Sequence, residues 1–173
     1  MNVWYLHGLE SPVGGPKVDF LHSVADKVYA PKMDYNHPEM FSSLLKLAKY
    51  NKPDLIIGSS MGGYFADVLG SHLDVEVLLF NPALHSRPIE PEGVTYGGTN
   101  WKRNFVLGSK DKVINYSTVI KQCQSNWSSL TTTRIENNEI EKAILKTLIE
   151  TKGFSEKIKY QPYLTKKADF VVE

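Results

Sequence analysis

The segment from Asp54 to Tyr64 constrains the fold more than any other part of this sequence. It starts with an apolar run, continues as Gly-Ser-Ser-Met-Gly, and leads into apolar residues at helical spacing. Gly58 and Gly62 leave room where a strand and a helix pack closely around a strained turn. We therefore predict a buried strand, a tight bend that presents Ser60, and a helix whose N-terminus points at Ser60. An ordinary strand–turn–helix junction is the alternative reading.

Short apolar runs alternate with amphipathic segments along most of the chain, which is typical of an α/β fold. The expected strands are 3–6, 27–29, 55–57, 75–80, 105–107 and 132–135. Several are apolar throughout, as in a parallel sheet that is covered on both faces. Helices are expected to start at Pro16, at Pro38, after Ser60 and at Ser117, and a last helix is expected around 140–149. The pattern predicts a mainly parallel sheet between helices.

We expect residues 1–153 to form one domain and residues 154–173 a tail of unassigned role, packed on or beside it. The stretch 82–100 is rich in proline and glycine and predicts a long irregular connection. Because this connection leaves little room for an elaborate cap, we expect a minimal cap over the carboxyl edge of the sheet and a small pocket.

Composition excludes several classes of function. Hydrophobic residues make up 42% and charged residues 23%, as in ordinary globular proteins, and the net charge of +1 gives no reason to expect nucleic acid as a partner. The single cysteine excludes an intrachain disulfide and a cysteine-cluster zinc site, and no metal-ligand spacing stands out. The sequence lacks an apolar run of roughly 18 residues and a basic leader, so we expect a cytoplasmic protein with no membrane partner. Nothing indicates an oligomeric state.

A nucleophilic serine needs donors for the negative charge that develops on the attacked carbonyl oxygen. The backbone N–H of Met61 follows Ser60 directly and is one candidate. The backbone N–H of Leu9, in the loop after the first strand, is the second, with His7 and Gly8 beside it in the pocket. Gly8 could instead serve only a tight strand exit.

Asp111 lies in the loop just after the predicted strand 105–107. A hydrolase of this architecture holds the acid that orients its base at this place. The alternative is a turn aspartate that accepts hydrogen bonds from nearby backbone.

Taken in order, these motifs resemble the α/β-hydrolase superfamily, and within it the YqiA-like small bacterial esterases. The resemblance spans about residues 3–150 and is carried by the segments 5–12, 58–64, 81–83 and 111–116. It implies an α/β-hydrolase-like three-layer sandwich and a serine esterase. Ser60 would be its nucleophile and Asp111 its acid, and it would act on a small-molecule ester without a cofactor.

The sequence departs from this family where the catalytic histidine is expected. The corresponding stretch 134–140 contains no histidine, Ile140 takes its position by counting, and no histidine follows His85. His85 follows the predicted strand 75–80, the next strand after Ser60, so it is our candidate for the general base. An ordinary surface-loop histidine is the alternative. His7 is a weaker candidate, because the histidine at this position in the family looks structural.

Two functions therefore stay open at this point. The first is a small serine hydrolase, similar to a carboxylesterase, that cleaves a small acyl ester. The second is a catalytically degenerate α/β-hydrolase fold that acts as a ligand-binding or regulatory module. The absent histidine favours the second function, whereas the intact glycine-flanked turn at Ser60 and the presence of Asp111 favour the first.

Overall fold

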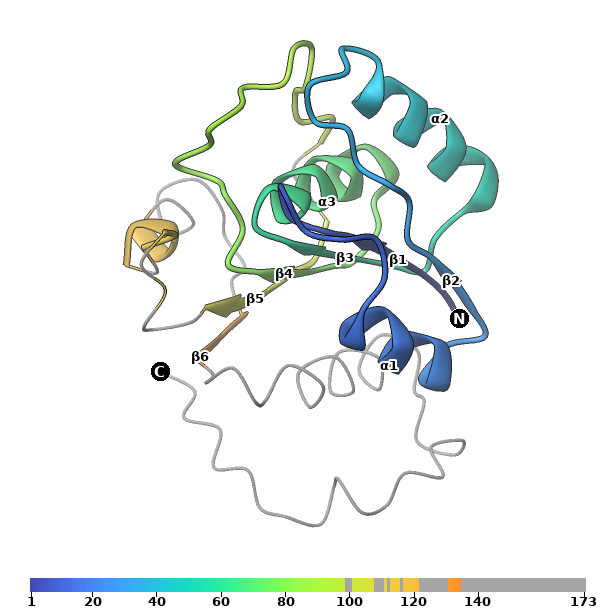
Figure 1. The fold of residues 1–173 in the computed structure, drawn as a ribbon. Coiled ribbons are helices and arrows are strands. Elements are labelled where there is room, and N and C mark those ends of the chain that lie inside the picture. The colour runs from blue at the N-terminus through green and yellow to red at the C-terminus, as the bar shows by residue number, and fades with distance from the viewer. Residues whose placement is uncertain (99–100, 108–110, 112, 116, 122–130, 135–173) are drawn as a thin grey trace, which may run out of the picture.

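A computed structural model describes residues 1–98, 101–107, 111, 113–115, 117–121 and 131–134. The described strands are β1 (Asn2–Leu6), β2 (Lys27–Tyr29), β3 (Leu55–Ser59), β4 (Val77–Phe80), β5 (Arg103–Leu107) and β6 (Thr131–Arg134). They form one sheet in the order β2-β1-β3-β4-β5-β6, and every neighbouring pair is parallel (Figure 1). This arrangement confirms the predicted parallel sheet.

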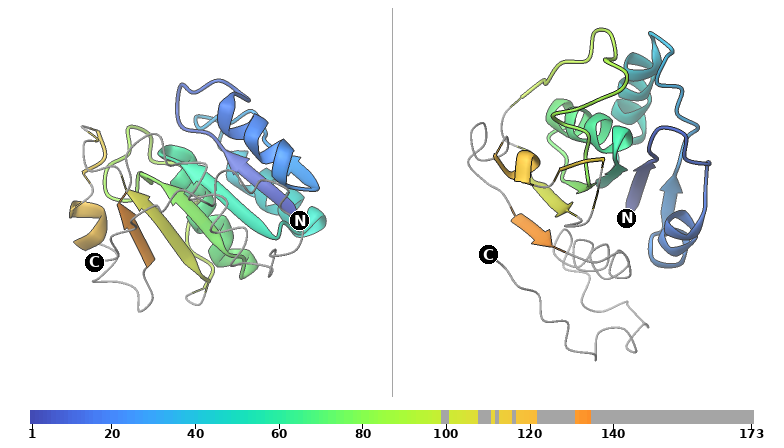
Figure 2. Two further views of the ribbon diagram at one scale, coloured as in Figure 1. Left: turned by 90° about the horizontal axis from the view of Figure 1, so that it is seen from below. Right: turned by 60° about the vertical axis from the view of Figure 1, so that its left-hand side comes forward.

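Helices cover both faces of the sheet. The helix α1 (Pro16–Val24) lies on one face, and α2 (Met40–Asn51) and α3 (Met61–Leu73) lie on the other (Figures 1 and 2). Residues 117–121 are helical as well. Within the described ranges, no helix is long and apolar enough to cross a membrane.

Strand β1 shows how one strand supplies both layers of the core. Trp4 and Leu6 belong to the apolar cluster that includes α2 and α3, whereas Val3 and Tyr5 belong to the cluster that includes α1. Successive side chains of a strand point to opposite faces, so an apolar run without alternation fits a strand that is buried on both sides.

Several predicted boundaries differ from the structure by one or two residues, among them the starts of α2, β4 and β5. Helix α2 starts at Met40, because the residues after His37 form a turn in which the Met40 N–H bonds to the His37 carbonyl at 3.0 Å. Strand β4 starts at Val77 and β5 at Arg103, each two residues from its predicted start. The predicted helix 140–149 and the predicted division between 1–153 and the tail 154–173 lie outside the described residues.

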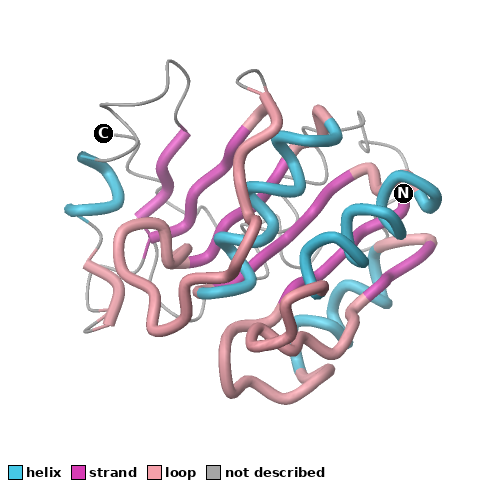
Figure 3. Tube along the Cα trace, turned by 90° about the horizontal axis from the view of Figure 1, so that it is seen from above, coloured by secondary structure: helices cyan, strands magenta, loops and turns pink. Residues whose placement is uncertain are grey.

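Residues 82–98 connect β4 toward β5 without a helix or strand, as predicted, and we call them the strap. The strap runs along α3 and covers one side of it (Figure 3). Four polar contacts hold it there: Tyr64 to the Val94 carbonyl (3.5 Å), Asp67 to the Tyr96 hydroxyl (2.8 Å), Ser71 to the Gly97 N–H (3.0 Å) and His72 to the Thr95 carbonyl (2.8 Å).

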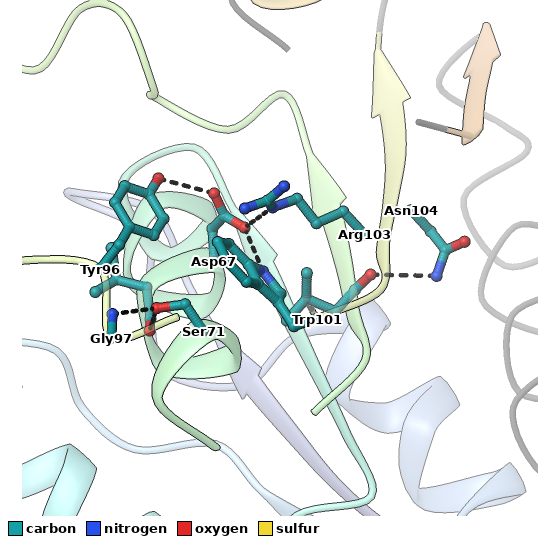
Figure 4. A network of polar contacts seen from close by, with 9 residues as sticks. Asp67, Ser71, Tyr96, Gly97, Trp101, Arg103 and Asn104 are labelled. Atoms are coloured by element: carbon teal, nitrogen blue, oxygen red, sulfur yellow. Dashed lines mark hydrogen bonds and ion pairs between the residues drawn. The ribbon is translucent and has the colours of Figure 1, made fainter. Parts of the chain in front are cut away.

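A buried ion pair ties α3 to the start of β5 (Figure 4). The Asp67 carboxylate accepts from Arg103 Nε and from Trp101 Nε1, both at 2.9 Å, and the Arg103 guanidinium lies 3.3 Å from the centre of the Trp101 ring. Burial raises the pKa of the Asp67 carboxyl, while Arg103 and the hydrogen bonds favour its charged form. The pair therefore depends on all its partners being in place.

Candidate active site

Ser60 occupies a strained turn between β3 and α3. Its φ is 52° and its ψ is −117°, a conformation that is costly for a residue with a side chain. Ser60 is also the N-cap residue of α3, yet its hydroxyl makes no capping hydrogen bond. Serine at this position normally uses its oxygen to cap the helix, so here the hydroxyl stays available for other chemistry.

Glycine is required on both sides of this turn because the backbones approach closely. A β-carbon on Gly62 would lie 2.1 Å from the carbonyl oxygen of Leu6, at the end of β1. A β-carbon on Gly58 would lie 2.3 Å from the carbonyl oxygen of Gly62. The Gly-x-Ser-x-Gly pattern therefore reflects the packing of β1, β3 and α3 around Ser60.

Backbone hydrogen bonds hold Ser60 from both sides. Its N–H donates to the Phe80 carbonyl, and its carbonyl accepts from the Ala83 N–H, both at 2.9 Å. Within the described residues, the N–H of Met61 has no acceptor, as expected in the first turn of a helix. One donor of the kind that an oxyanion needs therefore follows directly after Ser60.

The loop after β1 lies against Ser60. A β-carbon on Gly8 would lie 3.3 Å from the β-carbon of Ser60. The Gly8 carbonyl accepts from Nδ1 of the His7 ring at 2.7 Å. Because a peptide group is planar and trans, this bond turns the N–H of Leu9 away from the His7 ring.

His7 holds this loop through both of its ring nitrogens. Its Nε2 accepts from the backbone N–H of Met33 at 3.1 Å, so Nδ1 must carry the proton that Gly8 accepts. The Tyr35 hydroxyl also donates to the His7 carbonyl. A ring with both nitrogens engaged has no lone pair for a proton from Ser60, so His7 orients the loop.

Asp111 lies in the loop after β5, at the same carboxyl edge of the sheet as Ser60. Its Oδ1 accepts from the N–H groups of Val113 and Ile114, both at 2.8 Å. Its Oδ2 accepts from Nδ2 of Asn81 at 2.8 Å. The carboxylate is therefore held in one orientation by backbone and side-chain donors.

All of the histidines in the sequence lie in the described part of the chain. His22 and His37 are exposed, on α1 and before α2, and His72 bonds to the strap. His85 is half-buried in the strap, two residues after Ala83, which bonds to Ser60. Its Nδ1 is buried and has no hydrogen-bond partner among the described residues.

Sequence reasoning missed the residues that support the predicted ones. Met33 and Tyr35, which hold His7, lie between β2 and α2 in a segment without a motif. Asn81 belongs to the segment 81–83 that carries part of the family resemblance, but its bond to Asp111 joins positions 30 apart. The only available signal is that Asn81 directly follows the predicted strand 75–80 and that Asp111 comes four residues after the end of the predicted strand 105–107. Among the described residues, no group of three or more His, Cys, Asp or Glu side chains could hold a metal ion.

Comparisons with known proteins agree with this architecture. The model of a family described as Uncharacterised protein family (UPF0227) matches residues 2–91. No curated protein matches the sequence. Similar folds include a Xanthomonas campestris protein assigned to the alpha/beta hydrolase superfamily (18% identity, TM-score 0.62, covering 89% of this chain and 96% of that one).

Two further solved structures are similar over most of both chains. Est1E from Butyrivibrio proteoclasticus has 14% identity and a TM-score of 0.60, with 87% of each chain covered. An alpha-beta serine hydrolase homologue from Coxiella burnetii has 13% identity and a TM-score of 0.55, with 84% of each chain covered. At these identities the likeness establishes the fold, which is that of the α/β hydrolases.

Proposed function

Because the chain belongs to the uncharacterised protein family UPF0227 and has the α/β-hydrolase fold, we propose that it is a serine hydrolase that cleaves a small carboxylic ester at Ser60. The observation that carries the proposal is the strained backbone of Ser60, with φ of 52°, at a helix N-terminus that its hydroxyl does not cap. Strain of this kind persists where the surrounding structure enforces it, often at active sites.

In the proposed reaction, Ser60 Oγ attacks the carbonyl carbon of the ester while its proton passes to a general base. The N–H groups of Met61 and Leu9 donate to the oxyanion that forms. The bond to the alcohol oxygen then breaks, and the base returns the proton to the departing alcohol. Water, activated by the same base, cleaves the acyl-serine, which releases the carboxylic acid and restores Ser60.

We assign the role of the base to His85. It lies in the segment that bonds to the Ser60 backbone through Ala83, and its buried Nδ1 has no hydrogen-bond partner among the residues described. A ring nitrogen that no neighbouring group engages can keep its lone pair for a proton, which is what a general base needs. Asp111, which follows the neighbouring strand β5, would orient the ring and stabilise its charged form.

Hydrolysis of p-nitrophenyl acetate by the full chain tests the proposal. We expect turnover by the wild type, and losses of at least about 10³-fold in Ser60→Ala and in His85→Ala. His22→Ala, an exposed histidine on α1, is the matched control and should keep full turnover. If Ser60→Ala keeps its turnover, the proposed hydrolase is wrong. If Ser60→Ala loses turnover and His85→Ala keeps it, the hydrolase stands and His85 is not its base.

A protein without Ser60-dependent turnover would instead fit a ligand-binding or regulatory module. The observation that favours this second function is the absence of histidine in the sequence after β6. In that case, a small ester should bind to wild type and to Ser60→Ala without being cleaved, which calorimetry would detect.

A further inference from the structure

Asn81 has an unusual backbone conformation at the end of β4. Its φ is 39°, in the left-handed region, which asparagine tolerates better than most residues with a side chain. Its N–H donates to the Val106 carbonyl at 3.0 Å, so the residue is still attached to β5. The left-handed turn therefore occurs where the chain leaves the sheet at the end of β4. In the sheet, β4 lies between β3, which precedes Ser60, and β5, which precedes Asp111.

The side chain of Asn81 reaches the proposed acid. Its Nδ2 donates to Asp111 Oδ2 at 2.8 Å. The two N–H groups from Val113 and Ile114 both bond to the other oxygen, Oδ1. With donors on Oδ1 alone, the carboxylate could still rotate about that oxygen. The bond from Asn81 to Oδ2 fixes the second oxygen and thereby the plane of the group. Each carboxylate oxygen can accept about two hydrogen bonds, so Oδ2 keeps capacity for an imidazole N–H.

The segment that contains Asn81 also holds the nucleophile. The residue before it, Phe80, accepts the Ser60 N–H, and Ala83 donates to the Ser60 carbonyl, both at 2.9 Å. Asn81 therefore lies inside a short segment that bonds to Ser60 through its backbone and to Asp111 through its side chain. Residues 80–83 therefore connect the Ser60 backbone to the Asp111 carboxylate through hydrogen bonds at both ends.

We propose that Asn81 is a positioning residue that sets the orientation of the Asp111 carboxylate relative to Ser60. This inference rests on the proposed function, because orientation of the acid matters only if Asp111 serves a base. A misplacement of about 1 Å in a catalytic group costs up to about 100-fold in rate. Loss of the Asn81 amide should accordingly lower turnover without changing how the substrate binds.

The test compares Asn81→Gly with wild type in ester hydrolysis. Glycine tolerates the left-handed backbone and removes the amide donor. We expect kcat to fall about 10- to 100-fold while KM stays nearly constant. Asn81→Asp also removes the donor and places a second carboxylate beside Asp111, so it should lose at least as much. Asn36→Gly, at an exposed asparagine before α2, should keep wild-type kcat.

A second comparison separates positioning from a general effect on the fold. If Asn81 acts through Asp111, Asn81→Gly should cause no further loss of kcat in an Asp111→Ala background. The role of Asn81 is wrong if Asn81→Gly lowers kcat by the same factor in both backgrounds, or if Asn81→Gly has the kcat of the wild type. In either case, turnover that depends on Ser60 still supports the hydrolase. Turnover that survives Ser60→Ala overturns the hydrolase and the role of Asn81 with it. Circular dichroism of each variant verifies that it is folded.

Discussion

Gly62 packs so tightly against Leu6 that a β-carbon on the glycine would lie 2.1 Å from the leucine carbonyl oxygen. Leu6 ends β1, and Gly62 is the second residue of α3. This contact sets how closely the start of α3 approaches the loop that carries Gly8 and Leu9. The two proposed oxyanion donors, on Met61 and Leu9, depend on that approach.

Gly62→Ala should destabilise the protein strongly. The new methyl group meets backbone rather than a flexible side chain, so β1 and α3 must separate. Overpacking typically lowers the free energy of unfolding by about 1–3 kcal/mol. Because this contact is with rigid backbone, we expect a loss of about 3 kcal/mol or more. Urea unfolding followed by circular dichroism measures the loss. A variant with wild-type stability would show that α3 does not need this close approach.

Gly8→Ala is the matched substitution on the other side of Ser60, and it should affect activity more than stability. Its β-carbon would lie 3.3 Å from the Ser60 β-carbon and 3.4 Å from the Ser59 carbonyl oxygen, which small shifts can relieve. The methyl group would crowd the Ser60 side chain, so we expect about a tenfold loss in kcat/KM with a nearly unchanged urea midpoint. Unchanged kcat/KM would contradict the proposed location of the substrate.

Asp67→Ala should be among the most destabilising substitutions on α3. It leaves the buried Arg103 guanidinium without its carboxylate and breaks the bonds from Trp101 and Tyr96. Removing one partner of a buried ion pair costs about 3–5 kcal/mol. Glu90→Gln, which weakens the exposed pair with Arg87, should cost less than about 1 kcal/mol. Equal losses in the two variants would contradict this difference between the pairs.

Alkaline pH should destabilise the protein through Tyr5. Burial raises the pKa of its phenol from 10.0 to about 12, so the folded state keeps the proton over a range in which the unfolded chain loses it. The resulting stability is complete below pH 10 and is lost as the pH rises toward 12, by about 2–3 kcal/mol. In urea unfolding from pH 9 to 12, Tyr5→Phe should lose less stability than wild type. If the free energies of unfolding of wild type and Tyr5→Phe fall in parallel with pH, the loss of stability does not come from Tyr5.

The strands and the turn at Ser60 could be predicted because their signals are local. The apolar run 55–57 and the glycines around Ser60 reflect contacts between adjacent elements of the chain. The start of β5 was missed because Arg103 and Asn104 are polar residues in a buried strand. Their partners, Asp67 and Glu76, lie 36 and 28 positions away, and such pairing is not visible in a linear pattern.

The hydrogen-bond partners of His7 and Asp111 could not be predicted from the sequence for the same reason. His7 is held by the backbone N–H of Met33, and a backbone donor has no residue signature. Asn81 was visible as part of a motif, but its bond to Asp111 depends on β4 and β5 being neighbours. The course of the strap was predicted as irregular, whereas its attachment to α3 depends on polar side chains spaced along that helix, such as Tyr64, Asp67 and Ser71.

Covalent labelling with a fluorophosphonate, followed by mass spectrometry of the proteolytic peptides, tests whether Ser60 is a nucleophile. The reagent phosphonylates serines that a nearby base and oxyanion donors activate, whatever the natural ester is. We predict a single adduct on Ser60 in the wild type, none in Ser60→Ala, and much slower labelling in His85→Ala. An unlabelled wild type, or equal labelling of wild type and Ser60→Ala, would contradict a nucleophilic Ser60.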